Sequence, residues 1–297
     1  MFDIVPQLAV NSLISGSIYA LVALGMALTY QNLKVLNFAH GHLMMLGGYI
    51  YLFASVDSEL GVLSSALITA TFLVAISAVV LFFFIQPFLK INPLLVLVTT
   101  LALSTLIESL VAMLFGVNVK SLGSVLSPTS LEFGSVYITE LQIVIILLTL
   151  TLLTVSAWVM HRTSVGRSIR ALAENSAAAE SFAVPGRKVS AVVFACSVVA
   201  AGLAGVLIGY ETNLTPTMGT AYTIKGLAAI LLGGLGSVWG TILGAYVLGV
   251  VENFSIGLEF WGHSLPAGYK DAFAFVIILL VLLVRPEGMF GMRKRKI

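Results

Sequence analysis

The chain has 297 residues, of which 59% are hydrophobic and 9% are charged, and its formal net charge is +2. So little charge could not cover the surface of a water-soluble domain of this length, and several apolar runs reach or approach the roughly 20 residues that cross a bilayer as a helix. A membrane β-barrel would instead show short segments of alternating polarity. The composition therefore predicts an all-α, polytopic transmembrane bundle without room for a soluble catalytic domain.

Polar breaks divide the chain into apolar runs that predict about 8–10 spans within a single domain, residues 1–297. The runs are 6–30, 35–55, 61–85, 94–117, 139–160, 189–210, 223–251 and 270–284. The N-terminus lacks a basic stretch and a small-residue cleavage site, so we expect it to be retained rather than cleaved as a signal peptide. Cys196 is the one cysteine, which excludes a disulfide within the chain and argues against a metal cluster.

Basic residues predict which side of the membrane each break faces, because lysine and arginine near span ends favour the cytoplasm. The polar segment 161–188 and the tail 285–297 each contain five of them, so both are expected inside. Counting back from 161–188 places Lys90 and Lys34 inside and the loop 118–138 outside.

Counting forward reaches the tail on the correct side only if one run crosses an even number of times. The candidate is 223–251, which is long and is interrupted at Gly233, Gly234, Gly236 and Ser237. We predict two helical pieces there, either two short spans or a re-entrant pair; the alternative is a misplaced run boundary. Such breaks at membrane depth occur only where the freed backbone faces protein or a watery cavity.

A second interruption, Asn37-Phe38-Ala39-His40-Gly41, precedes the residues LGGYI at 46–50, much as Gly233 to Ser237 precede LGAYV at 243–247. Corresponding interruptions in two halves favour a transport pathway near the bilayer midplane, although chance similarity explains five matching positions about as well. By contrast, we interpret Gly202, Gly205 and Gly209 as a ladder of small residues for helix packing.

Glu108 lies in the middle of the run 94–117, among serines and threonines. A carboxylate inside a membrane is costly and suggests a function; the alternative, which we favour, is a packing contact with the neighbouring hydroxyls. Glu252 is expected near the end of its run. His40 and His42 fall on different helix faces without a nearby carboxylate in sequence, so no metal site is expected. The candidate pathway residues are Asn37, His40, Gly41, Glu108, Gly233, Gly234, Gly236 and Ser237.

The segment 161–188 is expected to contain one short helix. Ser164 is the predicted N-cap, and Pro185-Gly186 is predicted to end the helix. Its apolar stripe consists of Ile169, Leu172, Ala173 and Ala179. Because such a stripe in water needs a surface to dock on, we expect it to contact a cytoplasmic partner.

The same segment resembles the cytoplasmic coupling segment of ABC-importer permeases. The resemblance rests on Gly166, Arg170, Ala171, Ala173, Glu174, Ala177 and Gly186. With the stretch GSIYALVALGMALTYQNLKVLNFAHGHLMMLGGY from residue 16, the chain is similar nearly end to end to the LivH-type permease of branched-chain amino acid ABC importers. The similarity is weaker at 118–138 and around 254–268.

This resemblance implies a non-enzymatic transporter subunit without cofactor, in a bacterial or archaeal cytoplasmic membrane. It implies import of leucine, isoleucine and valine, with coupling through the residues above and Leu172. The implied partners are a second related permease, two cytoplasmic ATP-binding subunits and an extracytoplasmic binding protein, but no nucleic acid. The chain itself has no GxxxxGK[ST] phosphate-binding loop, so ATP hydrolysis would belong to the partners.

Other functions remain open on the sequence alone. Permeases of similar architecture carry urea, short amides, other amino acids or, as a weaker option, ribose. A secondary transporter driven by an ion gradient would explain the broken helices and Glu108, but would leave the segment 161–188 unexplained. A membrane scaffold without a transport role predicts no helix breaks.

Overall fold

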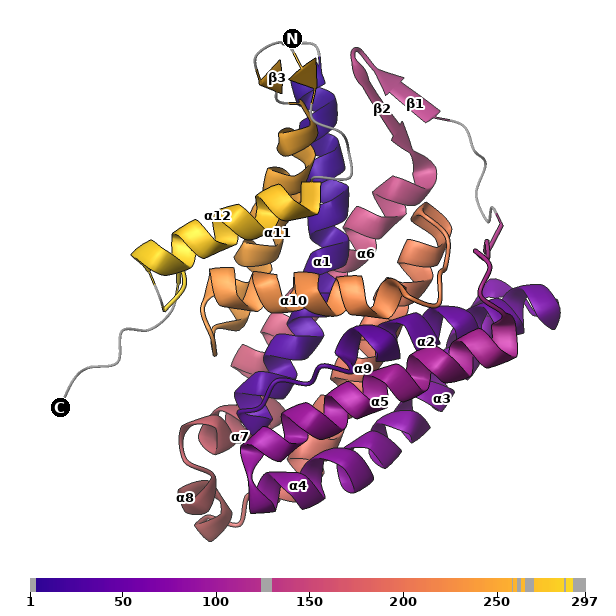
Figure 1. The fold of residues 1–297 in the computed structure, drawn as a ribbon. Coiled ribbons are helices and arrows are strands. Elements are labelled where there is room, and N and C mark those ends of the chain that lie inside the picture. The colour runs from indigo at the N-terminus through magenta and orange to yellow at the C-terminus, as the bar shows by residue number, and fades with distance from the viewer. Residues whose placement is uncertain are drawn as a thin grey trace.

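The computed structural model describes residues 4–123, 130–257, 259–260, 263–264, 270–285 and 287–290. Within these residues the chain is almost entirely helical (Figure 1), which confirms the predicted fold class. Six helices are long and apolar enough to cross a membrane: Val5–Leu33, Val62–Ile91, Pro93–Phe115, Glu140–Arg162, Gly186–Glu211 and Val238–Ser255. Two shorter apolar helices, Met218–Gly233 and Ala274–Val284, accompany them.

The first part of the chain follows the predicted runs closely. In order, its elements are α1 (Val5–Leu33), α2 (His40–Leu52) with the π-helical turn η2 (Phe53–Asp57), α3 (Val62–Val79) with the π-helical turn η3 (Val80–Ile85), α4 (Gln86–Ile91), α5 (Pro93–Phe115), and the antiparallel strands β1 (Ser130–Phe133) and β2 (Val136–Thr139). Asn92 caps α5 by accepting from the Leu94 N–H at 2.9 Å, and Pro93 suits the first helical position.

The second part contains the shorter and broken helices. Its elements are α6 (Glu140–Arg162), α7 (Ser164–Glu174), α8 (Ser176–Ser181), α9 (Gly186–Glu211), α10 (Met218–Gly233), α11 (Val238–Gly257), the strands β3 (Glu259–Phe260) and β4 (His263–Ser264), and α12 (Lys270–Val284). Thr139 and Gln142 form a reciprocal capping box at the start of α6. Figure 1 shows the two hairpins at one end of the molecule and α7 with α8 at the other.

Helix α1 is the central element. Within its most apolar window 89% of the residues are buried, against 22% for α6 and 33% for α5. The outward faces of α5 and α6 are apolar, with exposed residues such as Leu106 and Leu147. Helices α5 and α6 therefore present apolar surfaces that suit lipid or another membrane subunit.

Small residues let helices from distant parts of the chain approach closely. A Cβ atom built on Gly47 of α2 would lie 2.5 Å from the Cα of Gly202 in α9, and one on Gly205 would lie 2.0 Å from the carbonyl oxygen of Met44. This contact agrees with the packing role predicted for Gly202 and Gly205. A Cβ on Gly16 of α1 would similarly collide with Tyr246 of α11, so α2 packs on α9 while α1 packs on α11.

Both predicted interruptions are present. The run 35–55 becomes helical only at His40, because α1 ends at Lys34 in the left-handed region (φ +59°) and residues 34–39 are not helical. The run 223–251 divides into α10 and α11, with Gly234 and Gly236 at φ +101° and +92°. Glycine adopts such angles without a steric penalty, which explains why the break falls there.

Candidate functional site

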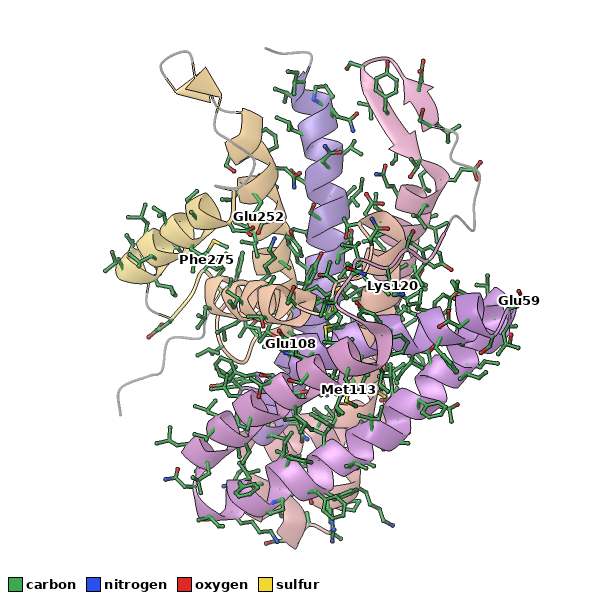
Figure 2. All side chains as sticks on the ribbon, turned by 45° about the vertical axis from the view of Figure 1, so that its right-hand side comes forward. Glu59, Glu108, Met113, Lys120, Glu252 and Phe275 are labelled. Carbon is green, nitrogen blue, oxygen red and sulfur yellow. The ribbon has the colours of Figure 1, made fainter. Side chains whose placement is uncertain are left out.

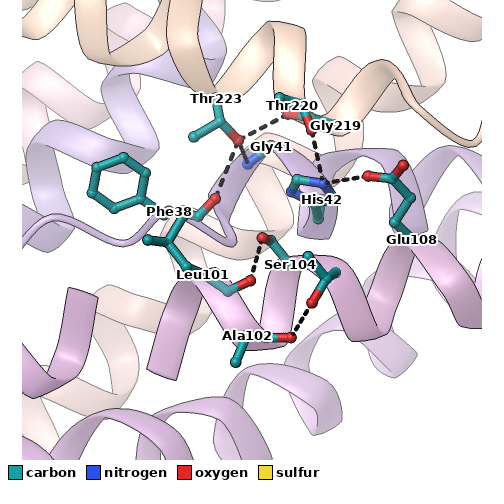
Figure 3. Close-up of polar contacts among 11 residues, drawn as sticks. Phe38, Gly41, His42, Leu101, Ala102, Ser104, Glu108, Gly219, Thr220 and Thr223 are labelled. Carbon is teal, nitrogen blue, oxygen red and sulfur yellow. Dashed lines mark hydrogen bonds and ion pairs between the residues drawn. The ribbon is translucent and has the colours of Figure 1, made fainter. Parts of the chain in front are cut away.

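The start of α2 lies against the first half of α10 (Figure 3). The Gly41 N–H donates to Thr223 Oγ1 at 3.1 Å, and Thr223 donates to the carbonyls of Gly219 (2.8 Å) and Phe38 (3.3 Å). A Cβ on Gly41 would lie 2.2 Å from the Gly219 oxygen, so no larger residue fits without separating the two helices. The broken backbone at 37–41 is thus directed at protein and bound to α10.

Glu108 and His42 meet beside this contact. His42 Nε2 lies 3.2 Å from Glu108 Oε2 and 3.4 Å from Thr220 Oγ1 (Figure 3). The favoured prediction that Glu108 pairs with adjacent hydroxyls is wrong, because Ser104 and Thr105 donate to carbonyls of their own helix, as helical hydroxyls often do. The Glu108 side chain is 33% exposed, so this acid lies at the margin of the interior.

Asn37 and His40 are buried, and the His40 ring lies between α1 and α9. Asn37 Oδ1 accepts from the Ala39 N–H at 3.0 Å, whereas its Nδ2 has no hydrogen-bond partner in the described part of the chain. The His40 ring packs on Gly25, where a Cβ would lie 2.6 Å from its Nε2. Buried polar groups are normally satisfied, so an unpaired amide marks a place where another group can bind.

A buried ionic cluster joins α1, α10, α11 and α12. Lys225 Nζ lies 3.0 Å from Glu252 Oε2 and 3.1 Å from Asp271 Oδ1. Tyr19 donates to Glu252 at 2.6 Å and accepts from Lys225 at 2.9 Å, and Lys225 also lies 4.7 Å from the centre of the Tyr19 ring. Lys225 and Glu252 are almost wholly buried, whereas Asp271 is about half exposed.

This cluster lies deep in the bundle. Tyr19 is 14 residues from either end of α1, or about 21 Å at 1.5 Å per residue, so it falls near the middle of a helix that is longer than the bilayer core. Glu252 lies five residues before the end of α11, as expected for the end of its run, yet it reaches the middle of α1. Figure 2 places it toward the middle of the molecule, unlike the peripheral Glu59. Sequence analysis missed Lys225 and Asp271, although each is a charge at the margin of an apolar run.

The predicted pathway residues of the second break, Gly233 to Ser237, lie away from the contact between Gly41 and Thr223. Gly233 lies ten residues beyond Thr223 on α10, about 15 Å along the helix. The Ser237 hydroxyl accepts from the Gly240 N–H at 3.0 Å, and Met289 and Phe290 donate to the carbonyls of Leu232 and Gly233. Gly234 and Gly236 lie in the same turn, which is hydrogen-bonded and close to the end of the molecule that carries α7, since Trp239 contacts His161 at 3.5 Å.

The segment 161–188 forms two helices rather than one. Asn175 leaves the helical region between α7 and α8, and its side chain accepts from the Ala178 N–H, which starts a new helix. The N-cap is Thr163 and not Ser164, because the Thr163 hydroxyl accepts from the Gly166 N–H at 3.1 Å. Pro185 and Gly186 do not end this helix; they begin α9.

The apolar stripe of this segment packs inside the chain itself. Ile169 is 4% exposed and forms a small core with Met160 and Val193, and Leu172 is 7% exposed. The expectation that the stripe docks on a partner is wrong, since α6 and α9 provide its cover. Of the other two stripe residues, Ala173 is half-buried and Ala179 is buried.

Two of the coupling candidates brace α7 against α6. The Arg170 guanidinium donates to the carbonyl of Met160, near the C-terminus of α6 where free carbonyls favour a cation. A Cβ on Gly166 would lie 2.3 Å from the same oxygen. Ala171 is half-buried, Glu174 is exposed, and the side chain of Ala177 lies outside the described residues. Across the part of the chain that the structure describes, no cluster of histidine, cysteine and acidic residues could hold a metal.

Comparison with known proteins identifies the family. The profile described as "Branched-chain amino acid transport system / permease component" matches residues 8–282. The permease protein BraD of a high-affinity branched-chain amino acid transport system in Pseudomonas aeruginosa is 31% identical over 96% of this chain and 95% of its own length. The corresponding LivH of Salmonella typhimurium is 30% identical over 95% and 94%.

A shorter similarity, 35% identity over 43% of this chain and 41% of the relative, links it to the ribose import permease protein RbsC of Escherichia coli. No solved structure matches the chain. The six long apolar helices agree with a multi-pass membrane protein. The match over 8–282 shows that the chain belongs to the permease-component family of branched-chain amino acid transport systems.

Proposed function

We propose that this chain is the membrane-spanning subunit of a bacterial or archaeal ABC importer that carries leucine, isoleucine and valine across the cytoplasmic membrane. The observation that supports this most is the family match over residues 8–282, which covers the long apolar helices except for the first three residues of α1. The names of the relatives BraD and LivH supply the substrate class. The ribose permease matches only part of the chain and gives weaker support to a sugar.

The proposed assembly contains a second related permease, two cytoplasmic ATP-binding subunits and an extracytoplasmic binding protein. The segment 161–188 and the basic tail lie in the cytoplasm, as the excess of lysine and arginine favours. The binding protein docks at the opposite end, where Lys120 and Leu214 pair by backbone hydrogen bonds and Gln7 bonds the backbone of Tyr137.

Coupling runs through α7 in this proposal. An ATP-binding subunit bears on the outer face of α7, where Arg167 is exposed. Because Arg170, Gly166 and the buried stripe fasten α7 to α6 and α9, displacement of α7 moves those helices with it. ATP binding thereby shifts the equilibrium between two conformations of the membrane helices, because the ATP-binding subunits favour one conformation over the other.

The pathway is proposed to run beside α10, near Asn37, His40 and Gly41. Lys225 holds α10 to α1, α11 and α12, so that α10 moves together with these helices. The permease needs to hold its substrate only weakly, because the binding protein selects it. Lys225 and Glu252 form an ion pair with each other, so neither offers a free charge to the substrate.

The experiment is uptake of radiolabelled leucine into proteoliposomes that contain the chain with its co-purified partners. ATP is supplied on the side of the ATP-binding subunits and binding protein on the other, and proton and sodium gradients are tested separately. We expect uptake only with both ATP and binding protein. Uptake by this chain alone on an ion gradient would overturn the proposal, and ATP-dependent uptake of ribose instead of leucine would overturn the substrate.

Coupling is tested in the same assay with Arg167→Glu, which reverses an exposed charge without touching the core. We expect ATP-dependent uptake to fall at least tenfold while the protein remains inserted. Leu172→Asp is unsuitable as the sole test, because it would bury a charge within this chain. The matched control is Arg162→Gln, an exposed cation outside α7. Equal uptake by Arg167→Glu and wild type would remove α7 from the coupling route.

A further inference from the structure

A cavity of about 980 Å³ lies where the end of α1, α4, α7 and the first turn of α9 meet. Figure 1 shows these elements gathered at one end of the molecule. The volume of the cavity is within the range of small-ligand sites, roughly 300–1,000 Å³. The buried Leu172 is among its lining residues, so the cavity lies on the inner side of α7. A partner that bears on the outer face of α7 would leave it open to a small ligand.

The lining carries an excess of positive charge. Lys34, Lys90 and Arg187 contribute three cations, and Glu174 contributes one carboxylate, which leaves a net charge of +2. Among the described residues none of these cations forms an ion pair. Unneutralised charges of one sign around a recess concentrate counter-ions of the other sign, so the cavity favours an anion.

Two further details suggest that the lining is built for binding. Both amide atoms of Asn32 are buried without a partner in the described part of the chain, although such groups are normally satisfied. Lys34 has a left-handed backbone that glycine adopts more readily, so the lysine side chain is present despite the strain. The Arg187 guanidinium lies 5.0 Å from the centre of the Phe82 ring, which orients it at the cavity wall.

The cavity adjoins the apolar surface of the bundle. Phe83 is 70% exposed and Ile91 is 74% exposed, and each is next in sequence to a lining residue, Phe82 and Lys90 respectively. Cations and exposed apolar side chains therefore meet at one level, as they do where a membrane protein contacts phospholipid headgroups. Basic pockets between helices at the cytoplasmic side of a membrane bind anionic headgroups in this way.

We propose that this cavity binds a phosphate-bearing anion, either the headgroup of an anionic phospholipid or a soluble phosphate ester. Lys34 and Lys90 act as point charges, Arg187 offers two parallel donors, and the Asn32 amide supplies a neutral donor. The bound phosphate links α1, α4 and α9 behind α7. The binding itself does not rest on the proposed transport function.

The test measures lipid retention by native mass spectrometry of the full chain, purified from nanodiscs that contain equal amounts of phosphatidylglycerol and phosphatidylcholine. The variants are Lys34→Gln, Lys90→Gln and Arg187→Gln. Lys188→Gln is the matched control, because Lys188 is exposed and adjacent to Arg187 but does not line the cavity. A second arm measures binding of glycerol 3-phosphate and of inorganic phosphate by calorimetry.

We expect wild type to retain phosphatidylglycerol selectively and each cavity variant to retain it about fivefold less, with Lys188→Gln unchanged. Saturable binding of glycerol 3-phosphate with the same dependence, without lipid retention, would support the site and assign it to a soluble phosphate. Equal losses in Lys188→Gln would overturn the proposal, because they would indicate diffuse surface attraction. The proposal would also be overturned if the cavity variants bind the anion as wild type does but no longer co-purify with the ATP-binding subunits. That result would assign the cavity to a protein partner.

A failure of folding is separated from a loss of binding by Lys90→Arg, which keeps the charge and should retain the lipid. All variants are compared by gel filtration before measurement. If Lys90→Arg loses lipid as Lys90→Gln does while both elute as wild type, charge is not the determinant and the proposal fails.

Discussion

Two interruptions of the helical chain, residues 34–39 and 234–237, meet the same helix α10 at different places and in different surroundings. The first is partly buried, and its Phe38 hydrogen-bonds Thr100 of α5 and Thr223 of α10. Its Asn37 amide nitrogen has no partner in the described part of the chain. The second is a turn whose backbone bonds to Met289 and Phe290 and whose glycines take left-handed angles. Glycine density marks the second in the sequence and a short polar stretch marks the first. Of the two, only the first has an unpaired buried side-chain group among the described residues. In the proposed function, the first belongs to the pathway, whereas the second is a bonded turn outside it.

Lys225 lies on α10 between the two interruptions, and its replacement should have the largest effect. In Lys225→Met, the carboxylate of Glu252 remains buried without its cation, which we expect to lower the free energy of unfolding by about 3–5 kcal/mol. Unfolding titrations with sodium dodecyl sulphate in mixed micelles measure this. The double variant Lys225→Met with Glu252→Met should recover most of the loss; no recovery would mean that the cluster does not hold α10.

Gly41→Ala tests the first interruption directly. Its Cβ would meet the Gly219 oxygen at 2.2 Å, so α2 and α10 must separate, and overpacking of this kind lowers stability by about 1–3 kcal/mol. We expect leucine uptake to fall more than tenfold as the pathway geometry is lost. Gly61→Ala is the control, because its nearest atom is 3.8 Å away. Uptake at the wild-type level in Gly41→Ala would place the pathway elsewhere.

Gly236→Ala tests the second interruption. No atom lies within 4 Å of its Cβ position, so the change acts only through the left-handed backbone and should lower stability by about 1 kcal/mol. We expect uptake close to wild type when it is measured below the unfolding temperature. A loss of uptake as large as that of Gly41→Ala would erase the distinction between the two interruptions.

Glu108→Gln should have the smallest effect. Glu108 is partly exposed and Gln keeps a hydrogen-bonding group for His42, so the free energy of unfolding should change by no more than about 0.5 kcal/mol. We expect uptake within twofold of wild type and unaffected by a proton gradient. Uptake that became dependent on pH or lost its ATP requirement would instead give Glu108 a role in ion coupling.

The sequence was sufficient for features that depend on local chemistry. Glycine density located the division between α10 and α11, and the polar stretch at 37–41 located the start of α2. It was insufficient where distant residues decide the outcome. Lys225 pairs with Glu252 and Asp271, 27 and 46 positions further along the chain, and periodicity alone does not reveal such partners. The stripe at Ile169 and Leu172 was recognisable as apolar, but nothing local indicates that α6 and α9 cover it.

The prediction of helix caps from the sequence was limited for a different reason. Thr163 and Ser164 are adjacent hydroxyl residues with similar capping preference, so only the backbone geometry distinguishes them. Asn175 was similarly overlooked, because an asparagine within a short polar segment fits either a helix or its interruption until its side chain is placed.

The close packing of α2 on α9 through Gly47 and Gly202 also affects how the protein is made. These two glycines are 155 positions apart, so α2 leaves the ribosome well before the helix that covers it. Until α9 is synthesised and inserted, the glycine face of α2 must be covered by lipid, by other nascent helices or by an insertion factor. Premature termination before α9 would therefore leave an early helix without its partner and expose it to membrane proteases.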